Sequence, residues 1–244
     1  MNPWYWSGWA LSKIAARLLF SYRIIHRERL IEEGGVLFAM NHQSFLDPPL
    51  AGIACRKPIH FLARKSLLDW PVLGPVFPKL NVVPVDQDKA DMSALKTVIR
   101  LLQSGERTII FPEGGRTSDG ALQPAQPGIG LVVARTRVPV IPMRVFGAYE
   151  AFPRGARGIR RHPITVVVGE PLRFSEPDVT GRGREVYQRI ADRVMSAIAA
   201  LELPPEERTR FDRAATKGGS GSPRGPSGWA GSGGKGPPDA GHRA

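Results

Sequence analysis

Residues 36–47 have the sequence VLFAMNHQSFLD, in which an unbroken apolar run is followed at once by polar residues. An apolar run of this length without alternation is typical of a strand that is buried on both faces, as in a parallel sheet. Pro48 comes next, and Asp followed by Pro is a frequent helix start. The stretch therefore predicts a buried strand, a short turn and a helix, which is the repeating unit of α/β folds.

His42 and Asp47 have the chemistry of a base and the group that orients it. Five residues apart on one continuous helix, they would point to different faces, so their pairing requires the predicted turn. A carboxylate that accepts a hydrogen bond from one imidazole nitrogen fixes the tautomer and leaves the other nitrogen as a proton acceptor. The alternative is that Asp47 is an ordinary helix cap beside a surface histidine.

Three further blocks follow in the chain. FPEGGRTS at residues 111–118 again comes directly after a strand-like run, and FLARKSL at 61–67 and VPVIP at 138–142 are the other two. Together with residues 41–47, these blocks resemble the glycerolipid acyltransferase family, typified by 1-acylglycerol-3-phosphate acyltransferases. Any single block is weak evidence, but four in the same order over residues 35–145 identify the chain as a member of that family.

Several site residues follow from residue-by-residue matches to this family. His42 and Asp47 match its His-x4-Asp core, which implies a catalytic base and its orienting carboxylate. Arg116 matches the arginine of its Phe-Pro-Glu-Gly-Thr-Arg-Ser segment, and Arg64 stands where the family usually has a lysine. The resemblance implies that Arg116, Arg64 and the neighbouring Lys65 bind a phosphate group, whose oxygens guanidinium and ammonium groups recognise. For Arg64 and Lys65, a solvated surface pair is the alternative.

Glu113, Gly114 and Gly115 complete the predicted substrate-binding set. Glu113 is expected to bond a hydroxyl of the acceptor, although orienting Arg116 or capping the next helix are alternatives. Gly114 and Gly115 permit positive φ and close backbone approach. Gly115 replaces the family's usual threonine, and residues 122–126 lack its usual Phe-Lys pair, so an acceptor other than the common phosphate monoester is an alternative.

The resemblance implies an enzyme that moves a fatty acyl group from acyl-CoA or acyl carrier protein to the free hydroxyl of 1-acyl-glycerol-3-phosphate. The product is phosphatidic acid, an intermediate of phospholipid biosynthesis. The hydroxyl attacks directly, so we expect no acyl-enzyme. No His-rich spacing supports a metal site, so we expect no metal. We also expect no cofactor beyond the thioester co-substrate. One alternative is the same chemistry on glycerol 3-phosphate, another lysophospholipid or a lyso-ornithine lipid. Another is a non-catalytic protein that binds anionic lipid, although such a protein has no use for a base at His42.

The chain is strongly basic, with a formal net charge of +12 and a pI near 10.5. This charge favours anionic partners, such as a phospholipid surface, an acyl carrier's acidic face or coenzyme phosphates. The sequence has no zinc-finger spacing, RNA-binding signature or basic recognition helix, so nucleic acid is not an expected partner. Cys55 is the only cysteine, which excludes an intrachain disulfide and suits a cytoplasmic setting.

Residues 1–30 are predicted to form an amphipathic helix that lies in a membrane interface. The start is rich in Trp and Tyr, which favour the boundary between hydrocarbon and water. One helical stripe is apolar and the opposite side is basic, a pattern typical of interfacial helices. The stripe consists of Leu11, Ile14, Ala15, Leu18, Tyr22 and Ile25, with Lys13, Arg17 and Arg23 across from it. We expect peripheral or monotopic attachment to the cytoplasmic side of the cell membrane; the alternative is that the stripe packs on the domain.

Strand-like runs and helical patterns alternate through residues 31–213, which predicts one α/β acyltransferase domain with a mixed, largely parallel sheet flanked by helices. Functional residues then fall at strand ends, where such folds commonly bind ligands. Residues 214–244 are rich in Gly, Pro and Ser and are predicted to be a disordered tail. The expected strands are 36–40, 59–63, 82–85, 108–111, 138–145 and 164–168.

Overall fold

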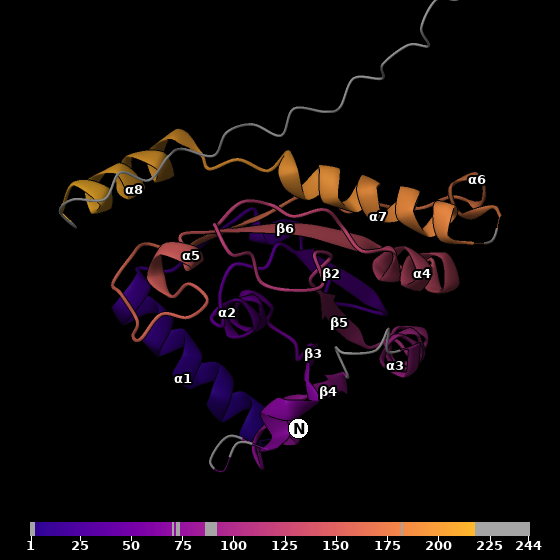
Figure 1. Cartoon of the computed structure of the whole chain (residues 1–244), viewed down its shortest axis with the longest axis horizontal. Coiled ribbons are helices and arrows are strands. Elements are labelled where there is room, and N and C mark those ends of the chain that lie inside the picture. The colour runs from indigo at the N-terminus through magenta and orange to yellow at the C-terminus, as the bar shows by residue number, and fades with distance from the viewer. Residues whose placement is uncertain (1–2, 70, 72–73, 86–91, 182, 218–244) are drawn as a thin grey trace, which may run out of the picture.

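A computed structural model of the chain describes residues 3–69, 71, 74–85, 92–181 and 183–217. These residues build a seven-stranded sheet in the order β1-β7-β6-β2-β5-β3-β4 (Figure 1). All neighbouring strands are parallel except β6 and β7, which are antiparallel. The predicted mixed, largely parallel sheet is therefore confirmed. The strands are β1 (Arg23–Ile25), β2 (Val36–Met40), β3 (His60–Arg64), β4 (Val82–Val85), β5 (Arg107–Ile110), β6 (Val140–Phe146) and β7 (Thr165–Val168).

Helices cover both faces of the sheet, because β2 is apolar on both of its faces. Val36, Phe38 and Met40 join a core cluster with α1, α2 and α5, whereas Leu37 and Ala39 join a second cluster with α3, α4 and α7. This is the period-two alternation of a strand buried between two layers. The helices are α1 (Pro3–Phe20), α2 (Asp47–Ala54), α3 (Met92–Gln103), α4 (Pro127–Thr136), α5 (Ala148–Ala151), α6 (Glu176–Val179), α7 (Arg184–Ala199) and α8 (Pro205–Lys217). Short 3₁₀ helices are η1 (Arg27–Arg29), η2 (Lys65–Asp69) and η3 (Phe77–Leu80).

The predicted helix over residues 1–30 is wrong in its length. The α1 helix ends at Phe20, and Ser21 has a positive φ of 44° that turns the chain. Residues 23–25 then form β1, which pairs with β7 at the edge of the sheet, so the α/β domain begins before residue 31. A strand of three residues is too short to show a recognisable strand pattern in the sequence. Its apolar positions also continue the helical periodicity of the residues before it.

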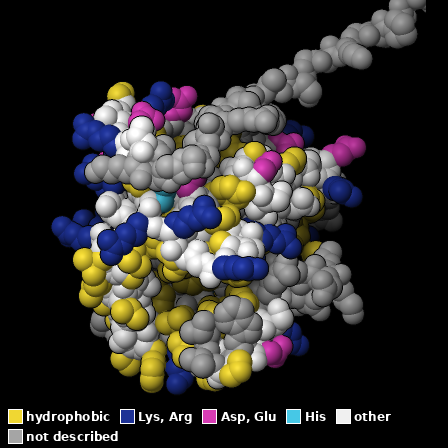
Figure 2. Space-filling model, turned by 60° about the vertical axis from the view of Figure 1, so that its left-hand side comes forward, with side chains coloured by type: hydrophobic (Ala, Val, Ile, Leu, Met, Phe, Trp, Pro, Cys, Tyr) yellow, Lys and Arg dark blue, Asp and Glu magenta, His cyan; other side chains and the backbone are white. Residues whose placement is uncertain are grey.

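Three of the four stripe residues that lie on α1 are exposed. Leu11, Ile14 and Leu18 are 70, 58 and 72% exposed, whereas Tyr5 and Phe20 on the other side are buried in the core. The alternative that the stripe packs on the domain is therefore wrong for these three residues. Figure 2 turns the left-hand side of Figure 1 forward and shows hydrophobic side chains gathered over its lower part. No helix among the described residues is both long and apolar enough to cross a bilayer.

The predicted start of the tail at residue 214 is also wrong, because α8 continues to Lys217. This helix is polar and is held by one buried carboxylate. Glu207 accepts hydrogen bonds from Arg23 of β1 at 2.7 Å and from the Thr165 hydroxyl of β7 at 2.8 Å. Polar anchoring of this kind leaves no apolar periodicity in the sequence. The rest of the predicted tail, residues 218–244, lies outside the described residues.

Candidate active site

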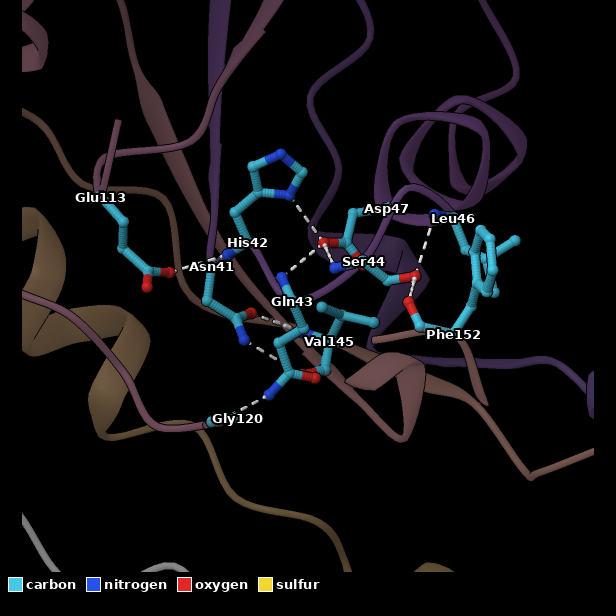
Figure 3. Close-up of polar contacts among 10 residues, drawn as sticks. All are labelled: Asn41, His42, Gln43, Ser44, Leu46, Asp47, Glu113, Gly120, Val145 and Phe152. Carbon is cyan, nitrogen blue, oxygen red and sulfur yellow. Dashed lines mark hydrogen bonds and ion pairs between the residues drawn. The ribbon is translucent and has the colours of Figure 1, made fainter. Parts of the chain in front are cut away.

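The structure pairs His42 with Asp47 in the turn between β2 and α2. The Nδ1 atom of His42 lies 2.7 Å from Oδ2 of Asp47, and the same oxygen accepts the backbone N–H groups of Gln43 at 2.6 Å and Ser44 at 2.7 Å (Figure 3). Asp47 is fully buried. It is the first residue of α2 and the N-cap is Leu46, so the carboxylate folds back over the turn and does not cap the helix.

This contact defines the tautomer of His42. A carboxylate oxygen accepts, so Nδ1 carries the hydrogen and Nε2 keeps its lone pair. The second ring nitrogen points away from Asp47 in Figure 3, and 17% of the side chain is exposed. The imidazole also stacks on the Phe111 ring, with centroids 4.0 Å apart. A ring held at one nitrogen and along one face presents Nε2 in a fixed direction, as a general base requires.

Two hydrogen bonds connect residues 113–117 to the backbone of His42. The His42 N–H donates to Oε1 of Glu113 at 2.7 Å, and the His42 carbonyl accepts the N–H of Thr117 at 2.9 Å. Because β2 and β5 are parallel neighbours, the segments that follow them meet at the same edge of the sheet. The structure thus brings together the two blocks that are far apart in the sequence.

Glu113 is a buried carboxyl group with both oxygens engaged. Besides Oε1, its Oε2 accepts the backbone N–H of Gln123 at 3.0 Å. Burial raises the pKa of Glu113 to about 7, partly opposed by the two backbone donors, and the nearby Asp47 raises it further. The observed contacts brace the loop against His42. Sequence reasoning did not find this arrangement, because a carboxylate bonded to distant backbone groups leaves no local pattern.

Arg116 contacts the turn that holds His42. Its guanidinium carbon is 3.4 Å from the centroid of the Phe45 ring, and Phe45 belongs to the same turn as His42 and Asp47. Such a face-on contact is a cation–π interaction, which fixes the plane of the guanidinium group. The predicted phosphate-binding arginine and the His42–Asp47 pair therefore share one neighbourhood.

Arg64 and Lys65 lie farther along the same edge of the sheet. Arg64 ends β3, which is separated from β2 by β5, and Lys65 opens η2 with an exposed side chain. The side chain of Arg64 is outside the described part of the structure. The backbone places both residues at the carboxyl ends of the strands, as predicted.

The two predicted glycines differ in conformation. Gly114 has a φ of +72°, and a Cβ atom there would lie 3.0 Å from the Gln126 side chain. Gly115 does not have positive φ, and no atom lies within 4 Å of the place its Cβ would take. Only Gly114 uses the positive φ that both glycines permit, and at Gly115 a larger side chain has room.

Three polar side chains around the pair were missed by the sequence reasoning. The Asn41 amide bonds both the N–H and the carbonyl of Val145, which ties the end of β2 to β6. Gln43 donates to the Gly120 carbonyl at 3.0 Å, and the Ser44 hydroxyl donates to the Phe152 carbonyl at 2.7 Å. The only signal in the sequence for a role of these three residues was that they are close neighbours of His42 in the chain. These bonds show that the turn is fixed from several sides.

Comparisons with known proteins show what the chain is similar to. A family model described as "Acyltransferase" matches residues 22–146. The chain is 31% identical over 146 residues to the chloroplastic 1-acyl-sn-glycerol-3-phosphate acyltransferase LPAT1 of Arabidopsis thaliana, covering 59% of this chain and 41% of that protein. It is 28% identical over 161 residues to the 1-acyl-sn-glycerol-3-phosphate acyltransferase of Bacillus subtilis, covering 66% of this chain and 78% of that protein.

A solved structure shows the same fold. The crystal structure of the 1-acyl-sn-glycerophosphate acyltransferase PlsC from Thermotoga maritima matches with a TM-score of 0.63 and 23% identity, over 81% of this chain and 80% of that one. The chain spans about two fifths of the length of the plant relatives, a chloroplastic protein of Brassica napus and LPAT1 of Arabidopsis thaliana.

Proposed function

The chain belongs to the acyltransferase family, and from that premise we propose that it acylates the free hydroxyl of 1-acyl-glycerol-3-phosphate to give phosphatidic acid. The donor is an acyl thioester, either acyl-CoA or acyl carrier protein, and the reaction belongs to phospholipid biosynthesis. The observation that carries the proposal is the 2.7 Å bond between His42 Nδ1 and the buried Asp47 carboxylate, which leaves Nε2 as the base.

In the proposed mechanism, Nε2 of His42 removes the proton of the acceptor hydroxyl as its oxygen attacks the thioester carbonyl. The tetrahedral intermediate collapses by breaking the C–S bond, and the imidazolium returns the proton to the leaving thiolate. Asp47 stabilises the imidazolium between these steps. General base help of this kind is worth about 10²–10⁴-fold. No acyl-enzyme is invoked, and Cys55 is unsuited to form one because burial raises its pKa to about 12.

We assign binding of the acceptor's phosphate group to Arg116, with Arg64 and Lys65 as further cationic contacts. The stacked guanidinium of Arg116 presents a planar fork that matches phosphate oxygens. Glu113 is assigned a contact to a glycerol hydroxyl in addition to its backbone bonds, since each carboxylate oxygen has a second lone pair. No metal or cofactor has a part in the proposal.

We assign membrane attachment to the exposed stripe of α1. Leu11, Ile14 and Leu18 would enter the interfacial region of a bilayer while the buried side of the helix stays on the domain. Attachment of this kind is peripheral or monotopic, and we place it at the cytoplasmic side of the cell membrane. A lipid acceptor would then reach the enzyme without leaving the membrane.

A second acceptor is favoured by one observation. Gly115 stands in open space where the family usually has threonine, which enlarges the room beside Arg116. Glycerol 3-phosphate, another lysophospholipid or a lyso-ornithine lipid are therefore the competing acceptors.

The test is acyl transfer by the purified protein in detergent or liposomes, with labelled acyl-CoA or acyl carrier protein and a panel of lyso-acceptors. We expect transfer to 1-acyl-glycerol-3-phosphate and a loss of at least a hundredfold in His42→Ala. Arg116→Ala should raise the acceptor's KM much more than the donor's. Equal rates for wild type and His42→Ala would overturn the assignment of the base.

A further inference from the structure

The loop between α5 and β7, residues 153–162, is an exposed and strongly basic surface. Its four arginines are all exposed, and none forms an ion pair with a described carboxylate. Ile159 lies among them and is 52% exposed. The arginines are Arg154, Arg157, Arg160 and Arg161. A large apolar side chain and four unneutralised guanidinium groups share one short loop.

The position of this loop relates it both to the candidate active site and to α1. Before the loop, the carbonyl of Phe152 accepts the Ser44 hydroxyl, and the Phe152 ring lies 6.1 Å from that of Phe45. After the loop, the Ile164 N–H donates to the carbonyl of Phe20 at the end of α1, at 2.9 Å. The loop therefore spans from the His42 turn to the helix that carries the exposed apolar stripe.

The arrangement of side chains on this side of the molecule is that of a membrane-binding face. Figure 1 places α1, α5 and the connecting loop on the same side, and Figure 2 shows a band of Lys and Arg side chains above a hydrophobic area there. Basic groups that flank exposed apolar groups match a bilayer, where headgroup phosphates lie above hydrocarbon.

We propose that residues 153–162 dock onto an anionic bilayer as a second contact beside α1, with the arginines on lipid phosphates and Ile159 in the interface. The inference rests on the proposed function, because it assigns the lipid surface from which the acceptor comes. An acidic carrier protein would also attract the arginines, but the exposed Ile159 and the neighbouring stripe of Leu11, Ile14 and Leu18 favour a bilayer. Two contacts, the loop that begins beside the His42 turn and the stripe of α1, would hold the turn toward the membrane.

The test is co-sedimentation of the full chain with vesicles of phosphatidylcholine alone and with added phosphatidylglycerol. The variant is Arg157→Gln with Arg160→Gln. Each arginine near an anionic surface strengthens binding roughly fivefold at low salt, so we expect the pair to weaken binding to anionic vesicles about thirtyfold. Binding to neutral vesicles should stay the same, and the difference should shrink at high salt.

The matched control is Arg173→Gln with Arg184→Gln, which removes the same charge from exposed positions near α6 and α7. If the control weakens binding as much as the loop variant, net charge alone is responsible and the proposal is overturned. If the loop variant binds vesicles normally but loses acyl transfer from the carrier protein, the loop docks the carrier and the proposal is likewise overturned. Vesicle binding is measured without turnover, so failure of the proposed acyl transfer is seen separately.

Discussion

At the scale of the residue, Glu113 couples the site to pH. Its pKa of about 7 in the folded protein exceeds the ordinary value of 4.5, so the folded state holds this proton more tightly than the unfolded chain. The corresponding stability is fully present below pH 4.5 and is lost as pH rises through 7. The loss amounts to about 3 kcal/mol. We expect urea unfolding from pH 4.5 to 8 to show this decline in wild type relative to Glu113→Gln.

At higher pH the charged Glu113 still accepts both backbone hydrogen bonds. The decline in stability therefore reflects the cost of burying a charged carboxylate, and no hydrogen bond is lost. Parallel stability profiles for wild type and Glu113→Gln would contradict the raised pKa.

Gly114 and Gly115 offer a matched pair of substitutions in the loop that binds His42. Gly114→Ala forces a Cβ into positive φ and against Gln126, which should lower the free energy of unfolding by about 1–2 kcal/mol. Gly115→Ala has neither problem and should change it by less than about 0.5 kcal/mol. Thermal or urea unfolding of both variants measures the difference, and equal losses would show that the two positions are not distinct.

At the scale of the element, α8 depends on Glu207. This carboxylate is buried and contacts Arg23, Arg210 and Thr165, which belong to three different elements. Glu207→Ala leaves the largely buried Arg210 without its carboxylate partner and should lower the free energy of unfolding by about 2–4 kcal/mol. This range is set below that of a fully buried pair because the second cation, Arg23, is 57% exposed. Hydrogen exchange should show faster opening of residues 205–217.

The control for this variant is Glu202→Ala, which removes an exposed ion pair with Arg208. Exposed pairs are worth about 0–1 kcal/mol, so little change is expected. If Glu202→Ala and Glu207→Ala destabilise the protein equally, α8 is not held by its buried carboxylate.

The elements that could be predicted from sequence are those with a strong local pattern. Strands β2 and β4 were expected with the same bounds as observed, because each is an apolar run that ends at a polar residue and is preceded by glycine or Asn. Strand β1 and helix α8 were missed, since their places are set by pairing with β7 and by Glu207, both distant in sequence. The His42–Asp47 pairing was expected from its chemistry. The bracing by Glu113 was not, because it depends on how a remote loop folds.

At the scale of the whole molecule, the sheet order explains why the site lies where it does. Strand β2 lies between β5 and β6, so its carboxyl end is near the middle of the sheet and is surrounded by loops on both sides. Those loops supply Glu113 and Arg116 from one side and Phe152 from the other. Strand order depends on contacts between distant segments, and the alternation of strands and helices along the sequence does not define it.

The same view of the whole molecule decides how membrane attachment by α1 should be tested. Deleting residues 1–25 would remove β1 as well as the buried Tyr5 and Phe20, so loss of binding could then follow from unfolding. Changing the exposed stripe by Leu11→Ser, Ile14→Ser and Leu18→Ser leaves the core intact, and the melting temperature should stay near that of wild type. Each half-immersed side chain contributes on the order of 1 kcal/mol, so binding to vesicles should fall about a hundredfold.

This triple variant should lose affinity for neutral and anionic vesicles alike, because the stripe acts through apolar burial. The loop variant at Arg157 and Arg160 should lose affinity for anionic vesicles alone, because arginines act through charge. Combining the two sets should give additive losses in binding free energy, since the substituted side chains act on the bilayer separately. A triple variant that binds neutral vesicles as tightly as wild type would show that the membrane meets another face of the molecule.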